Sequence, residues 1–194
     1  GDAACEFIAQ HASTQTPFFL YVPFTSPHGP YTLSKASDYA LFAGSGLTEN
    51  GKNSAALTYA MDRAVGNILA CLDTYGIATN PVVFFTNDNG GPLNKDGAHR
   101  NTPLRGGKSD TYEGGIRMPF IARWVGTIPA GAEDTGSVVS AIDISPTICR
   151  FAGVPVEDEL DGMDRSAVFL GKASPRGEPV FWQYGHPHAI LKGG

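Results

Sequence analysis

The sequence predicts an α/β fold in which helices flank a mixed, largely parallel sheet. Two neighbouring segments carry this prediction: an amphipathic helix over residues 57–75 and the short apolar run Val82 to Phe85 that follows it. The run is bounded by Pro81 and by Asn, Asp and Gly, which is typical of a buried strand. A helix, a turn and a buried strand in this order form the crossover unit of a parallel α/β sheet.

Composition limits the classes of protein to which the chain can belong. Its 194 residues, 42% hydrophobic and 17% charged, suit one globular domain with a core. A formal charge of -5 and dispersed Lys and Arg residues argue against a nucleic-acid partner. No apolar run approaches the roughly 18 residues of a membrane span. We therefore predict a single domain over residues 1–194, and the sequence leaves its oligomeric state open.

The segments before the central helix predict a helix, a strand and a loop. The opening dozen residues place Ala4 and Ile8 on one helical face. The run FFLYVPF, residues 18–24, predicts a second buried strand. In the following TSPHGPY, prolines on either side hold His28 in a defined loop past the strand end. His28 is thereby placed to face a site, and an ordinary loop residue is the alternative.

The central helix is the clearest element of the chain. Residues 31–52 are small and polar, and they predict a loosely helical excursion before it. Asn53 or Ser54 can cap the helix, and Gly76 suits the left-handed position that ends it. Its apolar face consists of Leu57, Met61, Ala64, Val65, Ile68, Leu72 and Tyr75. This spacing predicts a role in packing.

The remaining elements follow from short local patterns. Strands are predicted over residues 118–124, 138–142 and 179–184, with the start of a further strand after residue 186. Between them, Asp143 and Ser145 can cap a helix that Gly153 closes.

The cysteines do not predict a disulfide framework. Cys5, Cys71 and Cys149 are an odd number, widely spaced, without a CxxC pair. Each lies in an apolar helical context, so we expect small buried hydrophobic side chains. A single disulfide or a reactive thiol is the alternative.

Two short motifs place chemically active groups after the central strand. The oxygens of Asp88 and Asn89 are hard ligands suited to calcium or magnesium, at the strand end where ligands bind in α/β sheets. Further on, Gly106 and Gly107 let backbone approach a small anion, and Lys108 adds a positive charge. The alternatives are an Asx-turn and a solvated surface lysine.

These motifs occur together in an order that resembles the type I sulfatases of the alkaline-phosphatase superfamily. The matching blocks are FFLYVPFTSPHGPY, YAMDRAVGNILACLDTYG, VVFFTNDNGG, NTPLRGGKSDTYEGGIRMPFIARW and DISPTICRFAGV. Five blocks in family order are more specific than any one motif. The resemblance implies an alkaline-phosphatase-like fold and hydrolysis of sulfuric esters.

The resemblance also implies roles for individual residues. Asp88 and Asn89 would ligate a divalent cation, calcium or alternatively magnesium. Lys108 would contact a sulfate oxygen, and His28 would contact the sulfate ester or protonate its leaving oxygen. Both are therefore candidate catalytic and substrate-binding residues. His99 would reach the substrate.

One part of the family pattern is absent from the sequence. The family's nucleophile is a formylglycine made from the cysteine of a C-x-P/A-x-R motif, which no cysteine here begins. We therefore interpret residues 1–194 as the middle and later part of a catalytic domain. It would lack the N-terminal formylglycine motif and the C-terminal subdomain, and it would be inactive alone. A natural pseudoenzyme is the alternative. We expect Arg105 and Glu113 to hold the Lys108 loop through hydrogen bonds and to have no catalytic role.

The resulting hypothesis is a sulfuric ester hydrolase acting on a sulfated carbohydrate, located in the periplasm or outside the cell. One alternative is a phosphodiesterase or phosphonate hydrolase of the same superfamily. Another is a non-catalytic carbohydrate- or anion-binding module, in which Tyr31, Trp182 and Tyr184 could stack on sugars.

Overall fold

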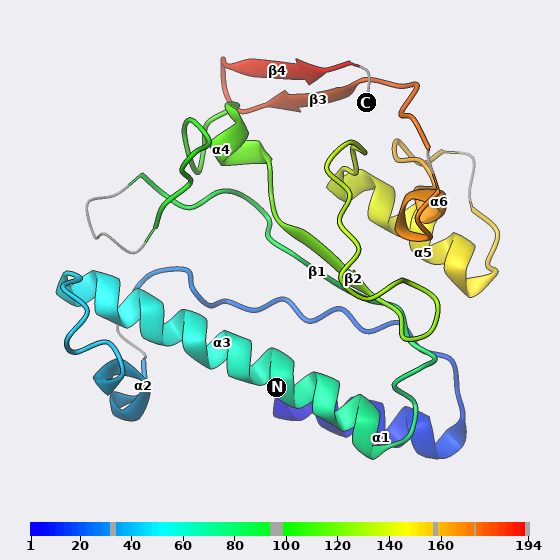
Figure 1. Cartoon of the computed structure of the whole chain (residues 1–194), viewed down its shortest axis with the longest axis horizontal. Coiled ribbons are helices and arrows are strands. Elements are labelled where there is room, and N and C mark those ends of the chain that lie inside the picture. Colours follow the sequence, from blue (N-terminus) through cyan, green and yellow to red (C-terminus); the bar gives the residue numbers. More distant parts are fainter. Residues whose placement is uncertain (32–33, 94–98, 157–158, 173, 193–194) are drawn as a thin grey trace. The chain divides into compact units, whose positions relative to one another are not determined.

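The computed structural model describes residues 1–31, 34–93, 99–156, 159–172 and 174–192 (Figure 1). The chain divides into two compact units, each of which contains two separate stretches of sequence. Unit 1 consists of Gly1–Pro81 and Gly91–Pro103, and unit 2 consists of Val82–Gly90 and Leu104–Gly194. No helix within the described ranges has the length and apolar character needed to cross a membrane.

Unit 1 is helical, whereas unit 2 combines short helices and strands. The helices of unit 1 are α1 (Asp2–Thr14), α2 (Ala36–Ala40) and α3 (Glu49–Thr74). The elements of unit 2 are β1 (Val83–Thr86), α4 (Glu113–Ile116), β2 (Phe120–Arg123), the 3-10 helix η1 (Ala141–Asp143), α5 (Ile144–Ala152), α6 (Ser166–Phe169), β3 (Val180–Gln183) and β4 (His188–Leu191).

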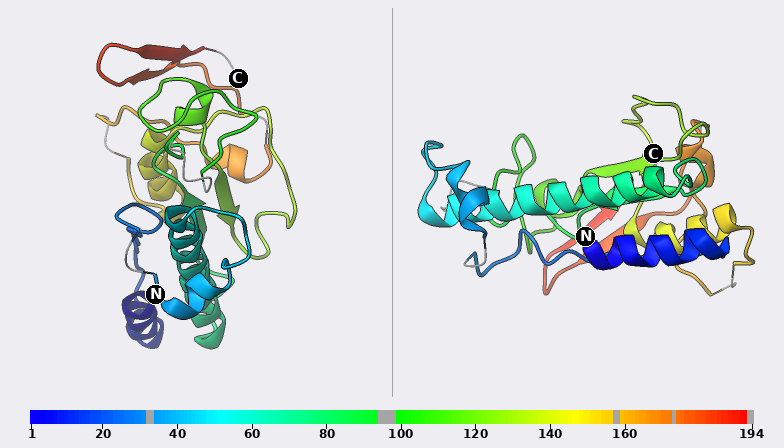
Figure 2. Two further views of the ribbon diagram at one scale, coloured as in Figure 1. Left: turned by 90° about the vertical axis from the view of Figure 1, so that its left-hand side faces the viewer. Right: turned by 90° about the horizontal axis from the view of Figure 1, so that it is seen from below.

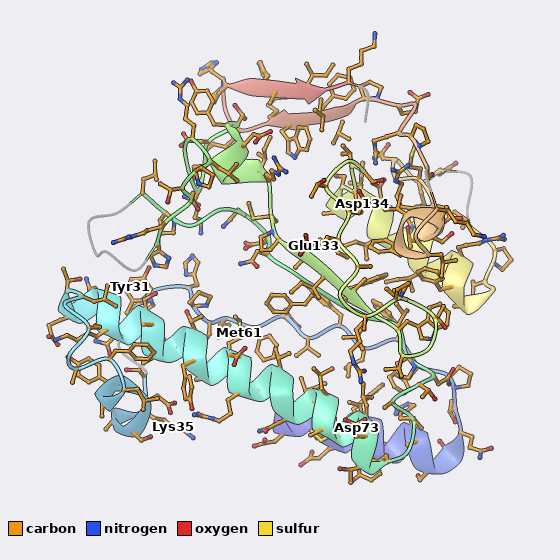
Figure 3. The ribbon with its side chains drawn as sticks, viewed as in Figure 1. Tyr31, Lys35, Met61, Asp73, Glu133 and Asp134 are labelled. Carbon is orange, nitrogen blue, oxygen red and sulfur yellow. A yellow bond between two sulfur atoms is a disulfide. The ribbon has the colours of Figure 1, made fainter. Side chains whose placement is uncertain are left out.

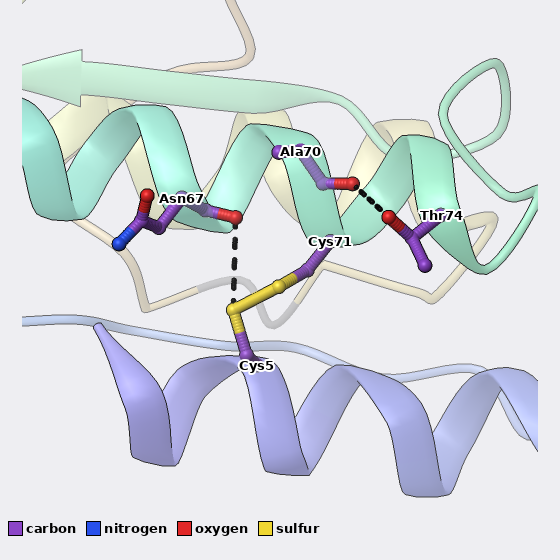
Figure 4. The surroundings of a disulfide bond; sticks show 5 residues. All are labelled: Cys5, Asn67, Ala70, Cys71 and Thr74. Atoms are coloured by element: carbon purple, nitrogen blue, oxygen red, sulfur yellow. Dashed lines mark hydrogen bonds between the residues drawn. A yellow bond between two sulfur atoms is a disulfide. The ribbon is translucent and has the colours of Figure 1, made fainter.

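A disulfide joins the two long helices of unit 1. Helix α1 lies alongside the C-terminal half of α3, and the two run in the same direction (Figures 1 and 2). Cys5 and Cys71 are bonded, with their Cα atoms 5.8 Å apart (Figure 4). The oxidised sulfur of Cys5 carries no hydrogen, so its 3.6 Å approach to the Asn67 carbonyl is a contact and not a hydrogen bond.

This disulfide corrects the expectation that these cysteines are isolated hydrophobic side chains. The pairing joins residues 66 positions apart, and sequence spacing does not show that the two helical faces meet. Cys149 is a free cysteine, and it is half-buried where a buried side chain was expected.

Helix α3 begins earlier than the sequence indicated. The side chain of Thr48 caps it by accepting a hydrogen bond from the Gly51 amide at 3.1 Å. The predicted cap at Asn53 or Ser54 is therefore wrong, and Ser54 lies buried inside the helix. The predicted end is confirmed, since Gly76 has a φ of 69°.

The segment over residues 18–24 is not a strand, contrary to the prediction. Its side chains alternate between half-buried and exposed, and Phe19 and Tyr21 are 66% and 75% exposed. The chain is thus extended with one face outward, but it forms no ladder with any other described segment. Apolar alternation predicts the extended conformation, whereas a strand also needs a hydrogen-bonded neighbour.

An aromatic cluster forms the packed face of unit 2. Strands β1 and β2 pair antiparallel, with Phe84 opposite Ala122. The Phe84 ring lies 5.4 Å from Phe120 and 4.9 Å from Phe169 of α6, and Phe151 of α5 joins the cluster. Both ladders that the structure describes are antiparallel, so the parallel pairing expected for residues 82–86 is not found among them.

Asp143 organises the second half of unit 2. It is fully buried, accepts hydrogen bonds from the Ser140 and Met163 amides at 2.8 and 3.0 Å, and pairs with Arg176. These contacts make residues 141–143 a 3-10 helix, so the strand predicted over residues 138–142 is wrong. The predicted strands around residues 118–124 and 179–184 are confirmed as β2 and β3, and β4 is the further strand.

Candidate active site

The turn after β1 presents the two predicted metal ligands. Strand β1 ends at Thr86, whose hydroxyl donates to the Pro119 carbonyl at 3.0 Å and ties the strand end to the segment before β2. Asp88 is then exposed and Asn89 is half-buried. The Asn89 amide nitrogen donates to the Gly90 carbonyl at 3.2 Å, which directs its side-chain oxygen the other way.

Close backbone contact fixes this turn against α4. The Gly90 amide donates to the Gly115 carbonyl at 3.1 Å. A Cβ atom on Gly90 would lie 1.8 Å from the Gly114 carbonyl oxygen, which is far inside van der Waals contact. Only glycine therefore fits at position 90 without moving one of the two backbones.

The same two glycines of α4 hold the loop that carries Lys108. The Gly114 amide donates to the Arg105 carbonyl at 2.7 Å. A Cβ atom would lie 2.2 Å from the Gly106 oxygen if placed on Gly114, and 2.5 Å from the Gly107 oxygen if placed on Gly115. We call this set, Gly90, Gly106, Gly107, Gly114 and Gly115, the glycine interlock. It joins the Asp88–Asn89 turn and the Lys108 loop through backbone contacts within unit 2.

Polar side chains brace the Lys108 loop. Asp110 accepts a hydrogen bond from the Gly107 amide at 2.9 Å. Arg105 donates to the Tyr112 hydroxyl at 2.9 Å, and its guanidinium lies 3.8 Å from the centre of that ring. Arg105 thus has the bracing role expected from the sequence, whereas Glu113 pairs with Arg117 four residues later.

His28 lies in unit 1, in a turn closed by a 2.9 Å hydrogen bond from its amide to the Thr25 carbonyl. The side chain is exposed, and its Nδ1 lies 2.8 Å from the Gly29 carbonyl oxygen. A carbonyl oxygen only accepts, so Nδ1 carries the hydrogen. In the neutral ring, Nε2 is then the nitrogen that accepts a proton.

His99 is held by two hydroxyl groups of unit 1. Its Nε2 lies 3.1 Å from the Tyr31 hydroxyl and 3.2 Å from the Ser54 hydroxyl of α3. Asn101 closes the loop that carries His99, because its side chain accepts from the Gly91 amide at 3.0 Å and donates to the Gly91 carbonyl at 2.8 Å.

The structure therefore joins the two segments that carry three predicted site residues, and it reveals other residues that support them. Asp88, Asn89 and Lys108 belong to segments joined by the glycine interlock, while His28 and His99 lie in unit 1. The sequence did not reveal the role of the Gly114–Gly115 pair, although two adjacent glycines near the Lys108 motif are typical of close backbone approach. It also assigned Ser54 to a helix cap and did not link Tyr31 to His99.

Asp88 and Asn89 fit part of a divalent cation site. Both supply hard oxygen atoms, and the Asn89 oxygen faces away from the bond to Gly90. Among the described residues there is no cluster of three or more His, Cys, Asp or Glu side chains able to hold a metal ion. Any cation held by the predicted pair Asp88 and Asn89 would therefore need further ligands beyond them.

Comparison with known proteins identifies the family. The family model described as Sulfatase matches residues 2–154. The chain is 37% identical to steryl-sulfatase of Rattus norvegicus over 164 residues, which cover 80% of this chain and 27% of that protein. It is 35% identical to N-acetylgalactosamine-6-sulfatase of Canis lupus familiaris over 190 residues, 94% of this chain and 34% of that protein. The chain therefore spans about a third of the length of these curated relatives.

A solved structure extends the match to the fold. The structure of Ps i-CgsB in complex with k-i-k-neocarrahexaose superposes with a TM-score of 0.90 at 32% identity, covering 99% of this chain and 43% of that one. The predicted α/β fold of the alkaline-phosphatase type is thereby confirmed. The chain belongs to the sulfatase family.

Proposed function

We propose that the protein containing this chain is a sulfuric ester hydrolase that acts on a sulfated carbohydrate. The observation that carries the proposal is the glycine interlock. It joins a turn with two hard oxygen ligands to a loop with one lysine, within one packed unit. A cation and a lysine ammonium together are suited to stabilise charge on a transferring sulfuryl group.

Each predicted residue has a proposed role in this reaction. Asp88 and Asn89 hold a divalent cation, calcium in preference to magnesium, through their side-chain oxygens. When bound, the cation would neutralise negative charge on the sulfate. Lys108 donates hydrogen bonds to a sulfate oxygen and adds a fixed positive charge.

We propose that His28 protonates the leaving group. When the S–O bond breaks, the leaving oxygen takes the electron pair and needs a proton. The Nδ1–H of His28 is engaged by the Gly29 carbonyl, so Nε2–H of the protonated ring is the proton donor. His99 is a further proposed substrate contact.

The nucleophile is proposed to be a formylglycine outside residues 1–194. None of the three cysteines begins the required motif, and two of them are joined in a disulfide. We accordingly propose that residues 1–194 form the middle and later part of one catalytic domain.

A sulfated oligosaccharide is the proposed substrate class. The solved neighbour that covers 99% of this chain is a complex with a neocarrahexaose. We also propose that the protein works in the periplasm or outside the cell. The Cys5–Cys71 disulfide supports this location, since such bonds persist in oxidising compartments.

Sulfate release from the product of the full reading frame that contains this chain tests the proposal. Sulfated oligosaccharides should release sulfate, chelation should abolish the activity and calcium should restore it. Lys108→Ala should lower kcat by at least about 100-fold, as expected when a charge-stabilising group is removed.

Lys172→Ala, at an exposed position of unit 2, is the matched control and should retain activity. Faster cleavage of phosphate diesters than of sulfate esters would favour the phosphodiesterase alternative. Tight oligosaccharide binding without sulfate release would favour a binding module.

A further inference from the structure

A continuous series of contacts in unit 1 leads from helix α3 to His28. It begins at Ser54, which is 1% exposed. Other hydroxyls of α3 bond back to their own helix: Thr58 donates to the Ser54 carbonyl at 2.9 Å, and Thr74 donates to the Ala70 carbonyl at 2.8 Å. The Ser54 hydroxyl instead reaches His99 Nε2 at 3.2 Å. This serine therefore serves a contact outside its helix.

Tyr31 continues the series from His99 to the His28 loop. Figure 3 labels Tyr31, whose side chain lies near the N-terminal end of α3. Its hydroxyl is 3.1 Å from His99 Nε2, and the two rings are 6.0 Å apart and tilted by 33°. The Tyr31 ring lies beside Gly29, where an added Cβ atom would be in van der Waals contact with three ring carbons at 3.7 to 3.9 Å.

Gly29 completes the connection. Its carbonyl accepts the Nδ1–H of His28 at 2.8 Å. The orientation of this carbonyl sets both the plane of the His28 ring and the nitrogen that carries the hydrogen. A tyrosine ring packed on Gly29 restricts how that peptide can rotate.

We propose that Ser54, His99 and Tyr31 are positioning residues that hold His28 in its proton-donating geometry. The proposal rests on the proposed function, and it assigns His99 a role through Tyr31. Anchoring to a 26-residue helix gives the exposed His28 loop a rigid reference. Misplacing a reacting group by about 1 Å can cost on the order of 100-fold in rate.

A pair of substrates distinguishes positioning from general damage. A sugar sulfate has a poor leaving group and needs the proton from His28, whereas 4-nitrophenyl sulfate has a good leaving group and does not. In the full reading-frame protein, Tyr31→Ala and His99→Ala should lower kcat on the sugar sulfate by about 10- to 100-fold. For Tyr31→Ala, which removes no proposed substrate contact, the loss on 4-nitrophenyl sulfate should stay below about threefold, with KM nearly unchanged.

Matched variants at exposed positions serve as controls. Tyr75→Ala and His186→Ala should keep both activities. Tyr31→Phe, which retains the ring beside Gly29, should fall between Tyr31→Ala and wild type. Equal losses on both substrates would indicate a merely structural role and overturn the proposal. An unchanged rate of Tyr31→Ala and His99→Ala on the sugar sulfate would also overturn the proposal.

A second measurement does not depend on activity. In 15N-histidine NMR spectra above the titration range, His28, assigned with His28→Ala, should be mainly the Nδ1–H tautomer. Tyr31→Ala and His99→Ala should reduce that population, whereas Tyr75→Ala should not. An unchanged tautomer ratio would overturn the positioning role even if the protein proved not to be a sulfatase. If the protein had no sulfatase activity but the two variants still changed the tautomer ratio of His28, the positioning role would be supported and the proposed function would be contradicted.

Discussion

Close contacts between glycine backbones join the two candidate site segments of unit 2, whereas side-chain hydrogen bonds and one ring contact connect Ser54, His99, Tyr31 and His28 in unit 1. In unit 2, Gly90 lies so close to Gly114 that no side chain fits between them. In unit 1, the series from Ser54 to His28 contains hydrogen bonds of 2.8 to 3.2 Å and one ring contact. Close backbone packing tolerates no added atom, while hydrogen bonds weaken by degrees. Single substitutions at these contacts should therefore lower the unfolding free energy more in unit 2 than in unit 1.

The largest effect is expected at the glycine interlock. Gly90→Ala would place a methyl group 1.8 Å from the Gly114 oxygen, and we expect a loss of more than about 3 kcal/mol in unfolding free energy. Gly66→Ala in α3, where a methyl group meets nothing within 4 Å, should be neutral or stabilising by up to about 1 kcal/mol. Urea unfolding of both variants measures this contrast. Equal stability of Gly90→Ala and wild type would remove the basis of the comparison.

The disulfide should have the next largest effect. Replacing both Cys5 and Cys71 with serine opens a closed loop and should cost about 3 kcal/mol. Hydrogen exchange should accelerate in α1 and α3 and remain unchanged in β1 and β2. Cys149→Ser is the control for loss of a thiol. Faster exchange throughout unit 2 would show that the two units are not independent in stability.

Removing the buried hydroxyl should cost less. Ser54→Ala leaves His99 bonded to Tyr31, so we expect a loss of about 1 kcal/mol in unfolding free energy. Thr58→Ala, which removes a bond within the same helix, is the control. A loss as large as that of Gly90→Ala would mean that the two regions respond alike.

The smallest effect should appear as a dependence on pH. The Arg63 guanidinium donates two hydrogen bonds to the Asp38 carboxylate, at 2.7 and 2.9 Å. These bonds lower the pKa of the Asp38 carboxyl. A carboxyl with a lowered folded pKa contributes stability above its unfolded pKa of about 3.9 and loses it as the pH falls through the folded value. The difference in Tm between wild type and Asp38→Asn should therefore shrink between pH 6 and pH 3. A constant difference would contradict the role of this ion pair, and Asp62→Asn is the exposed control.

Much of the fold could be predicted because its signals are local. The periodicity of α3, the left-handed Gly76 and the apolar run of β1 are each contained in one short stretch of sequence. The predictions failed where a partner lies far along the chain. Residues 18–24 have the apolar alternation of a strand without a paired neighbour. The strand predicted over residues 138–142 is instead a 3-10 helix at residues 141–143, where Asp143 pairs with the distant Arg176.

The candidate site was predictable to a similar extent. Asp88, Asn89 and Lys108 stand out because their motifs combine metal-binding oxygens, glycines and a charge. Their roles stay predictions. The residues that support them were missed because support depends on approach between separate segments. Gly114 and Gly115 are ordinary glycines until Gly90 packs against them, and Ser54 is an ordinary helical serine until His99 reaches it.

By itself, the sequence determined the order of the main elements, the available chemical groups and the resemblance to sulfatases, because composition, periodicity and motif order are properties of the chain alone. Only the tertiary structure decided that Cys5 bonds to Cys71, that α4 joins the Asp88 turn to the Lys108 loop, and that His28 carries its hydrogen on Nδ1. Each of these depends on distances and directions between particular atoms, which exist only once the chain has folded.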